Sequence, residues 1–234
     1  MKIPKIKFEF NQELDFNLAW EFYNNPNQAG ANFWNNGALK HHSGLKEMEI
    51  VSKKRDFLLN YINCYYKQQK NRIEKRKKEI EVLYDKKHSQ FFDEIGKIFK
   101  DYPWPKGKYI AYLSIFDFCP RFLNDKTFFV FVDDNDQNMI FTISHEMLHF
   151  IFYDYCLAKH FDIFKKQDTE SGPFWEIAEI FNVVVQQTPG FTALHGKINN
   201  GYPDLEPKIK SAKDLWTGDI DSWIKSFDLL SIKE

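Results

Sequence analysis

Apolar and polar positions follow several distinct patterns in the first hundred residues. Residues 3–10 alternate between the two kinds, which predicts a short strand, and residues 15–23 have a helical pattern. Residues 24–43 are rich in Asn and Gly without periodicity, which indicates a loop. A long helix is expected at about 44–87, where no Pro or internal Gly interrupts the pattern, and a second helix is expected at 90–99.

The centre of the chain has patterns typical of strands. Residues 108–116 and 127–132 are rich in aromatic and β-branched side chains, which predicts two adjacent strands of a mixed sheet. The segment between them, 117–123, contains a proline, which an edge strand tolerates because one row of its amides is unpaired. An edge strand can bind an extended peptide, so Arg121 and Phe122 are candidate substrate-binding residues. A simple connecting loop is the alternative interpretation.

The last part of the chain is predicted to be helical. Residues 142–151 carry no charge at any position outside their His-Glu-x-x-His core, as expected of a buried helix. Residues 174–187 are strongly apolar and follow a proline, which favours a second buried helix. Two closing helices are predicted at 204–216 and 219–229. The chain therefore divides into a mostly helical region, 1–105, and a mixed region, 106–234, which can form one continuous domain.

Composition excludes several classes of protein. The 234 residues include 32 basic and 33 acidic side chains, and this balance gives no reason to expect a nucleic-acid partner. No leading segment resembles a signal peptide and no apolar run reaches membrane-spanning length, so we expect a cytoplasmic protein that does not enter a membrane. Cys64, Cys119 and Cys156 lack paired spacing and are predicted to be buried thiols. The vicinal pair His41 and His42 is expected to be exposed.

Residues 145–149 read His-Glu-Met-Leu-His and carry the clearest chemical signal. Helical residues four apart share a face, so His145 and His149 can bind one zinc ion. Glu146 lies one position round, where a base can act on zinc-bound water. The uncharged flanks favour a helix beneath a cleft over a solvated one. A buried helix with two purely structural histidines is the alternative.

The stretch TISHEMLHFI, residues 142–151, resembles the extended signature of the zincin metallopeptidases. The metzincin branch would continue with Gly at 152 and His at 155, but this chain has Phe152 and Tyr155. The resemblance therefore implies the gluzincin, or thermolysin-like, branch, in which a glutamate on a second helix completes the site. It implies an α+β zincin-like fold, with a small mixed sheet packed on the two zinc-ligand helices, and one Zn²⁺ per chain. The long helix expected from the sequence pattern at about 44–87 is then an N-terminal extension of this fold.

The third metal ligand is expected on the second apolar helix. Glu176, Glu179, Asn182 and Gln186 form a narrow polar stripe there, and a buried carboxylate requires a charged or metal partner. Glu179, with Asn182 one turn later, matches the gluzincin pattern, in which a small polar residue supports the metal ligands. Glu176 is the alternative ligand. The intervening loop holds further candidates, which we expect to be solvated: His160, Asp162, Asp168 and Glu170.

These observations predict a zinc metallopeptidase that hydrolyses a peptide or protein substrate. Glu146 would take a proton from zinc-bound water and return it to the leaving amine. Several zincins also use a downstream His or Tyr to stabilise an oxyanion, which makes His195 and Tyr202 candidates, with a packing role as the alternative for each. Two other functions stay open: a processing protease dedicated to one partner protein, and a non-catalytic zincin-fold binding module.

Overall fold

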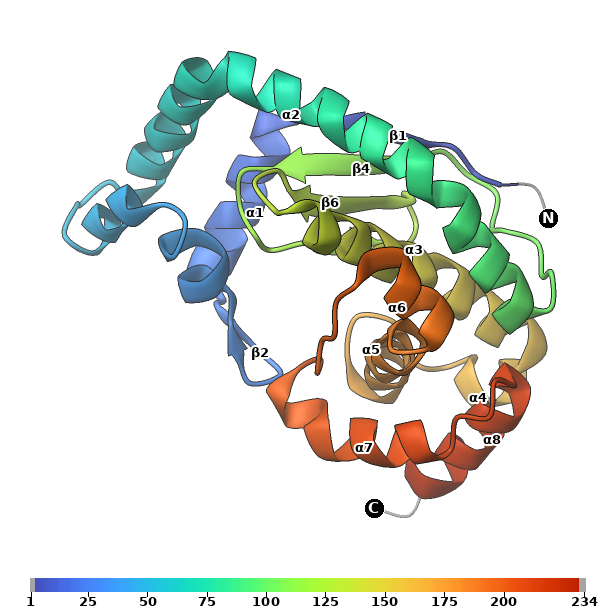
Figure 1. Cartoon of the computed structure of the whole chain (residues 1–234). Coiled ribbons are helices and arrows are strands. Elements are labelled where there is room, and N and C mark those ends of the chain that lie inside the picture. The colour runs from blue at the N-terminus through green and yellow to red at the C-terminus, as the bar shows by residue number, and fades with distance from the viewer. Residues whose placement is uncertain (1–2, 232–234) are drawn as a thin grey trace.

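The computed structural model describes residues 3–231 as a small sheet surrounded by helices (Figure 1). Its strands are β1 (Ile6–Glu9), β2 (Asn27–Gln28), β3 (Ala31–Asn32), β4 (Tyr109–Ser114), β5 (Arg121–Phe122) and β6 (Thr127–Phe131). Its α-helices are α1 (Gln12–Asn24), α2 (Lys54–Phe99), α3 (Asp136–Lys159), α4 (Phe161–Phe164), α5 (Gly172–Gln186), α6 (Pro189–His195), α7 (Glu206–Asp214) and α8 (Ile220–Ser231). The shorter segments are the π-helix η1 (Trp34–Leu39) and the 3₁₀ helices η2 (Ser43–Glu49) and η3 (Pro203–Leu205). Across residues 3–231, no helix combines the length and the apolar character that crossing a membrane would require.

Four strands form a mixed sheet in the order β1, β4, β6, β5. β4 runs parallel to both of its neighbours, and β5 pairs with β6 in the antiparallel sense at the edge. Every residue of β6 is buried, which explains why that part of the sequence is apolar at successive positions. The α+β class, the neighbouring central strands and an edge strand within 117–123 are confirmed, although only Arg121–Phe122 of that segment pair.

Helix α3 lies between the sheet and α5, so both predicted ligand helices belong to the interior (Figure 1). Asn135 begins α3, since its side chain accepts a hydrogen bond of 2.9 Å from the Asn138 amide. Nearly all of α3 from Met139 to Cys156 is buried. Helix α5 begins with Gly172 and Pro173, close to the predicted start at 174. The fold thus packs the two helices that carry the candidate metal ligands against each other.

Helix α2 differs from the two helices predicted at 44–87 and 90–99. It begins at Lys54, because the residues before it form η2, and it runs without a break for 46 residues. The predicted break is wrong because Tyr84, Phe91 and Ile95 continue one buried stripe across it, at helical spacing. The helix passes β1, α3 and α6 and so joins the amino-terminal half to the rest of the core.

The predicted loop at 24–43 contains regular structure. β2 and β3 pair as a small hairpin whose turn residues, Ala29 and Gly30, both have positive φ angles of 46° and 79°. The next residues form η1, which buries Trp34 and Ala38 in the core. The loop prediction is therefore wrong for these segments, because short pairings and a single π-helical turn leave no periodic pattern in the sequence.

Two predictions about single side chains also need correction. His42 is buried, and its Nε2 donates a hydrogen bond of 2.6 Å to the Ile115 carbonyl, so the prediction of an exposed histidine pair is wrong there. The predicted burial of the thiols holds only for Cys156, since Cys64 is exposed and Cys119 is half-buried. A buried histidine with a backbone partner is a structural residue.

Residues on both sides of position 105 contribute to one hydrophobic core. Phe99 at the end of α2, for example, lies 5.7 Å from the ring of Phe181 on α5 and 5.4 Å from that of Tyr155 on α3. The ranges 1–105 and 106–234 therefore share their buried side chains rather than forming separate cores.

Candidate metal centre

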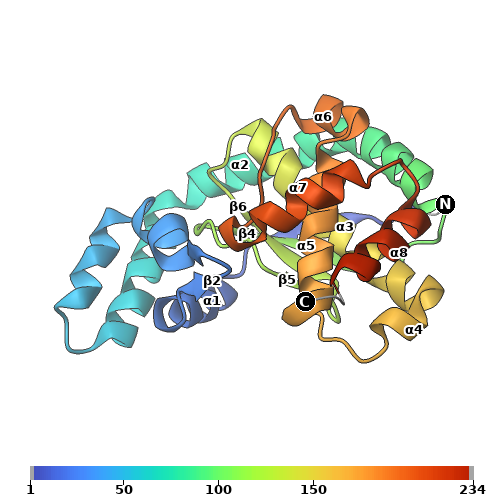
Figure 2. The same ribbon diagram turned by 90° about the horizontal axis from the view of Figure 1, so that it is seen from below.

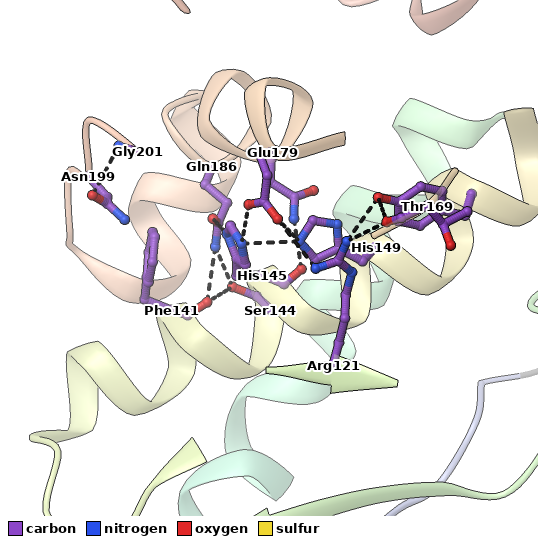
Figure 3. A network of polar contacts seen from close by, with 12 residues as sticks. Arg121, Phe141, Ser144, His145, His149, Thr169, Glu179, Gln186, Asn199 and Gly201 are labelled. Atoms are coloured by element: carbon purple, nitrogen blue, oxygen red, sulfur yellow. Dashed lines mark hydrogen bonds and ion pairs between the residues drawn. The ribbon is translucent and has the colours of Figure 1, made fainter. Parts of the chain in front are cut away.

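Helix α3 presents His145 and His149 one turn apart on the face that meets α5 (Figure 3). Packing fixes their positions, since His149 is only 1% exposed and the Nε2 atoms of the two imidazoles are 3.2 Å apart. The helical spacing of four residues therefore brings the two nitrogens together, as the sequence predicts.

Glu179 on α5 faces both imidazoles. Its Oε2 lies 3.3 Å from His145 Nε2, and its Oε1 lies 3.4 Å from His149 Nε2. A tetrahedral ion bound at about 2.0–2.1 Å keeps its donors about 3.3 Å apart, and each imidazole nitrogen lies at a similar distance from one of the two Glu179 oxygens. Among residues 3–231, His145, His149 and Glu179 form the group of His, Cys, Asp and Glu side chains that lie close enough together to hold a metal ion.

The alternative ligand, Glu176, lies elsewhere. Its Oε2 pairs with Lys208 Nζ of α7 at 2.6 Å, and the side chain is partly exposed. The candidate ligands from the intervening loop also have other partners, since His160 pairs with Asp221 and Asp162 pairs with Lys165. Of the two glutamates, the structure brings Glu179 and not Glu176 to the histidines.

Gln186 and Asn182, from the same stripe of α5, hold His145 in place. Gln186 Oε1 accepts a hydrogen bond of 2.9 Å from His145 Nδ1, which leaves Nε2 free to face the centre. The amide of Gln186 donates to Phe141 and Ser144 oxygens, so its own orientation is fixed. Asn182 donates to the backbone carbonyl of His145 at 2.9 Å. Asn182 therefore supports the α3 backbone, and Gln186, which was not singled out from the sequence, orients the imidazole.

Arg121 of β5 extends beneath the metal-ligand cluster instead of into the cleft (Figure 3). Its guanidinium lies 3.3 Å from Glu179 Oε1 and donates to Tyr153 Oη and the Thr169 carbonyl at 2.9 and 3.2 Å. The side chain is almost fully buried. Arg121 therefore neutralises the charge of a candidate metal ligand and does not line the cleft, and its contact with substrate stays a prediction.

The electrostatic surroundings favour a neutral His149 and an ionised Glu179, whereas they favour the charged form of His145. Burial, together with the Arg121 charge, lowers the pKa of His149 to about 3, so this imidazole is neutral at neutral pH. Burial alone would raise the pKa of Glu179, but the two histidines outweigh it and hold that pKa well below its ordinary value. Burial opposes the charge on His145 as well, yet Glu179 and Glu146 raise its pKa. An ionised carboxylate and a neutral imidazole are donors that metal ions bind.

Glu146 lies in a cleft of about 290 Å³ next to this cluster. The side chain is 5% exposed, and its carboxylate accepts no hydrogen bond from the described residues. Burial raises the pKa of Glu146 to about 7, against the opposing charges of His145 and Arg121. A carboxylate that is free to accept a proton near neutral pH is suited to act as a general base.

The two candidate oxyanion residues occupy different places. Tyr202 lines the cleft with Glu146, and burial raises the pKa of its hydroxyl, which keeps its proton. His195 is the last residue of α6 and packs edge-on against Phe141, with ring centres 5.1 Å apart. Its Nδ1 accepts a hydrogen bond from the Lys197 amide. His195 therefore packs beside the cleft and does not line it, and its contact with an oxyanion stays a prediction.

The predicted peptide-binding segment, 117–123, is divided between two surfaces. Asp117, Phe118 and Cys119 line the cleft. Phe122 is 43% exposed and borders a separate hollow with Leu157, and its contact with substrate stays a prediction. Arg121 and Phe122 are successive residues of β5, so their side chains project from opposite faces of the strand.

The cleft also contains residues that local patterns did not reveal. Lys197 and Asn199 follow α6, and Ala31 and Phe33 come from the amino-terminal hairpin region. Sequence periodicity carries no signal for such contacts, because chain folding brings the segments together over long separations. Comparison with known proteins adds no relative: no protein-family model, no curated protein and no solved structure matches this chain.

Proposed function

We propose that this protein is a zinc-dependent peptidase that hydrolyses peptide bonds. The observation that supports the proposal best is the meeting of His145, His149 and Glu179 beside a cleft that contains Glu146. Two imidazoles and one carboxylate form a typical three-ligand set of catalytic zinc sites, in which the fourth position stays open. The α+β architecture, with one ligand helix packed on a small sheet and the other packed on that helix, is compatible with the zincin fold that we propose for it.

Zinc at this centre would supply Lewis acidity, which lowers the pKa of a coordinated water and polarises a substrate carbonyl. Glu146 then has the role of general base: its carboxylate accepts a proton from the attacking water and returns it to the departing amine nitrogen. Tyr202 faces the same cleft and retains its proton, so its hydroxyl can donate to the oxygen that becomes negative. Arg121 and Gln186 take no part in proton transfer and keep the ligand atoms in position.

Metal analysis tests the first half of this proposal. We expect about one zinc ion per chain in protein purified without a chelator, measured by mass spectrometry. Glu179→Gln should reduce zinc affinity by about tenfold or more, because it removes a charged donor. Glu176→Gln is the matched control, since its carboxylate pairs with Lys208 outside the centre, and it should retain zinc. A wild-type protein that binds no zinc when zinc is supplied would exclude the proposal.

Peptide cleavage tests the second half. Glu146→Gln should retain its zinc and lose activity on a library of quenched fluorescent peptides by a factor of about 10²–10⁴, the usual contribution of a general base. Retained zinc is the control, because it shows that the centre still folds. Wild-type turnover by this variant would exclude Glu146 as the base. Cleavage of many unfolded proteins would distinguish a broad peptidase from a dedicated one.

A further inference from the structure

One basic side chain of the cleft is not used by the proposed reaction. Lys197 is the only Lys or Arg among the described residues that line the cleft. It is half-buried and forms no ion pair with a carboxylate of residues 3–231. The positive charge of Lys197 opposes the rise in the pKa of Asp134 that burial causes. The Asp134 carboxylate accepts a hydrogen bond from the Asn138 side chain and not from Lys197. The ammonium group therefore has hydrogen-bonding capacity available for a bound molecule.

Lys197 borders the same aromatic ring as the metal centre. Its Nζ lies 4.6 Å from the centre of the Phe141 ring, and that ring lies 6.0 Å from the ring of His145. His195 packs edge-on against Phe141, so the aromatic platform itself is held firmly. A substrate group that contacts the ammonium would thus lie a short distance along the cleft from the candidate metal ligands.

The backbone that carries Lys197 is fixed by several contacts. Gly196 has a positive φ of 67° and ends α6, and the Lys197 amide donates a hydrogen bond of 3.0 Å to His195 Nδ1. Farther along, Gln187 Nε2 donates to the Asn199 carbonyl at 2.6 Å, and the Gly201 amide donates to the Asn199 side chain (Figure 3). The backbone position of Lys197 is therefore set by the fold and not by a free loop.

The rest of the cleft wall combines apolar side chains with polar ones, among them the carboxylates of Asp117, Glu146 and Glu179, and one side of it is covered. Its aliphatic and aromatic members come from four parts of the chain: Phe33, Phe118, Val183, Leu205 and Ile209. The β2–β3 hairpin meets the segment before α7, where the Asp204 amide donates to the Ala29 carbonyl at 3.5 Å (Figure 2). Both segments line the cleft, so their contact covers that side of it. A cleft of this form suits a short apolar peptide segment better than a long chain passing through.

We propose that Lys197 binds a carboxylate of the peptide substrate beside the metal centre and thereby determines specificity. The inference rests on the proposed function, whose cleft and substrate class it uses. The carboxylate has two sources, the carboxyl terminus of a peptide or the side chain of an Asp or Glu residue, and the chemistry of recognition is the same for both. A charge-assisted hydrogen bond in a partly buried site contributes a factor of about 10–100 to affinity.

Binding to zinc-loaded Glu146→Gln protein provides the test, since this variant holds a peptide without cleaving it. Calorimetry would compare three peptides with the same apolar residues: one with a free carboxyl terminus, its amide, and an amide that contains one Glu. The free acid, the Glu peptide or both should bind about 10–100 times more tightly than the neutral amide. Which of them does so identifies the source of the carboxylate.

Charge variants then assign this preference to one residue. Lys197→Met should abolish the difference between the peptides, and Lys197→Arg should retain most of it. Lys210→Met, which removes an equal charge from an exposed site on α7, should leave the difference intact. Equal binding of all three peptides, or a preference that survives Lys197→Met, overturns the inference. If the preference is present and assigned to Lys197, but wild-type protein cleaves none of these peptides, the carboxylate site stands and the proposed peptidase function fails.

Discussion

Arg121→Met removes a buried positive charge beside Glu179 while keeping an unbranched side chain. The guanidinium makes three contacts within the core, at 3.3 Å to Glu179, 2.9 Å to Tyr153 and 3.2 Å to the Thr169 carbonyl. Removing one partner of a buried ion pair costs about 3–5 kcal/mol, because the other charge is left without compensation. In a domain of this size, such a loss lowers the melting temperature by roughly 6–20 °C.

The loss of stability caused by Arg121→Met should depend on whether a metal ion is bound. A divalent cation at the centre places positive charge beside Glu179 again, so zinc should stabilise Arg121→Met more than it stabilises wild-type protein. Urea unfolding followed by circular dichroism, in a chelator and in excess zinc, measures both free energies of unfolding. Arg72→Met is the matched control, because Arg72 pairs with Asp133 at the surface and contributes about 0–1 kcal/mol in either condition.

Two results would refute this reasoning. In one, metal-free Arg121→Met unfolds within about 1 kcal/mol of wild-type protein, which would mean that Glu179 does not depend on the guanidinium. In the other, the loss has the same size with and without zinc, which would mean that no metal approaches Glu179. If Arg121→Met does not fold without metal, Arg121→Lys retains the charge and gives a smaller loss for the same comparison.

Two further predictions concern supporting residues. Gln186→Leu should reduce zinc affinity by about 10–100-fold, measured against a chromophoric chelator, because His145 loses the hydrogen bond that fixes its ring; unchanged affinity would contradict this role. Burial raises the pKa of Asp15 to about 6, against hydrogen bonds from its neighbours. Its contribution to stability is therefore fully present below about pH 4 and declines as the pH rises through about 6, by about 3 kcal/mol in total. Asp15→Asn should unfold with a weaker pH dependence across this range, and an unchanged dependence would exclude Asp15 as its source.

The parts of the centre that sequence could predict are those set by one helix. The spacing of four residues brings His145 and His149 together on α3 whatever the rest of the chain does. The polar stripe of α5 contained Glu179, Asn182 and Gln186 at helical spacing, so the signal for Gln186 was also present. The pattern does not predict the role of Gln186, because the stripe indicates which residues face the neighbouring helix but not which atom each side chain contacts.

The parts that sequence could not predict depend on contacts between distant segments. The β5 strand was placed correctly at the edge, but the side of the strand on which Arg121 projects depends on its register with β6. Lys197 lies at the cleft because helix α6 follows α5 directly. The sequence does not indicate this second helix, since the proline and glycine at 189–190 usually mark the end of a helical region. The prediction divides the continuous α2 after residue 87 because residues 85–90 are all polar, although Tyr84 and Phe91 on either side of them belong to one buried stripe.

The α5 stripe explains why the three donors can have metal-ligand spacing in the protein alone. Each polar position has its own partner, so the stripe forms four separate contacts: Glu176 with Lys208 at the surface, Glu179 with the two imidazoles, Asn182 with the α3 backbone, and Gln186 with His145 Nδ1. Both helices are buried, and Arg121 compensates the charge of Glu179 from the opposite side. Ligands held in this way lose little conformational freedom on binding a metal. Most of the conformational entropy needed to order the centre is therefore lost when the protein folds and not when the metal binds.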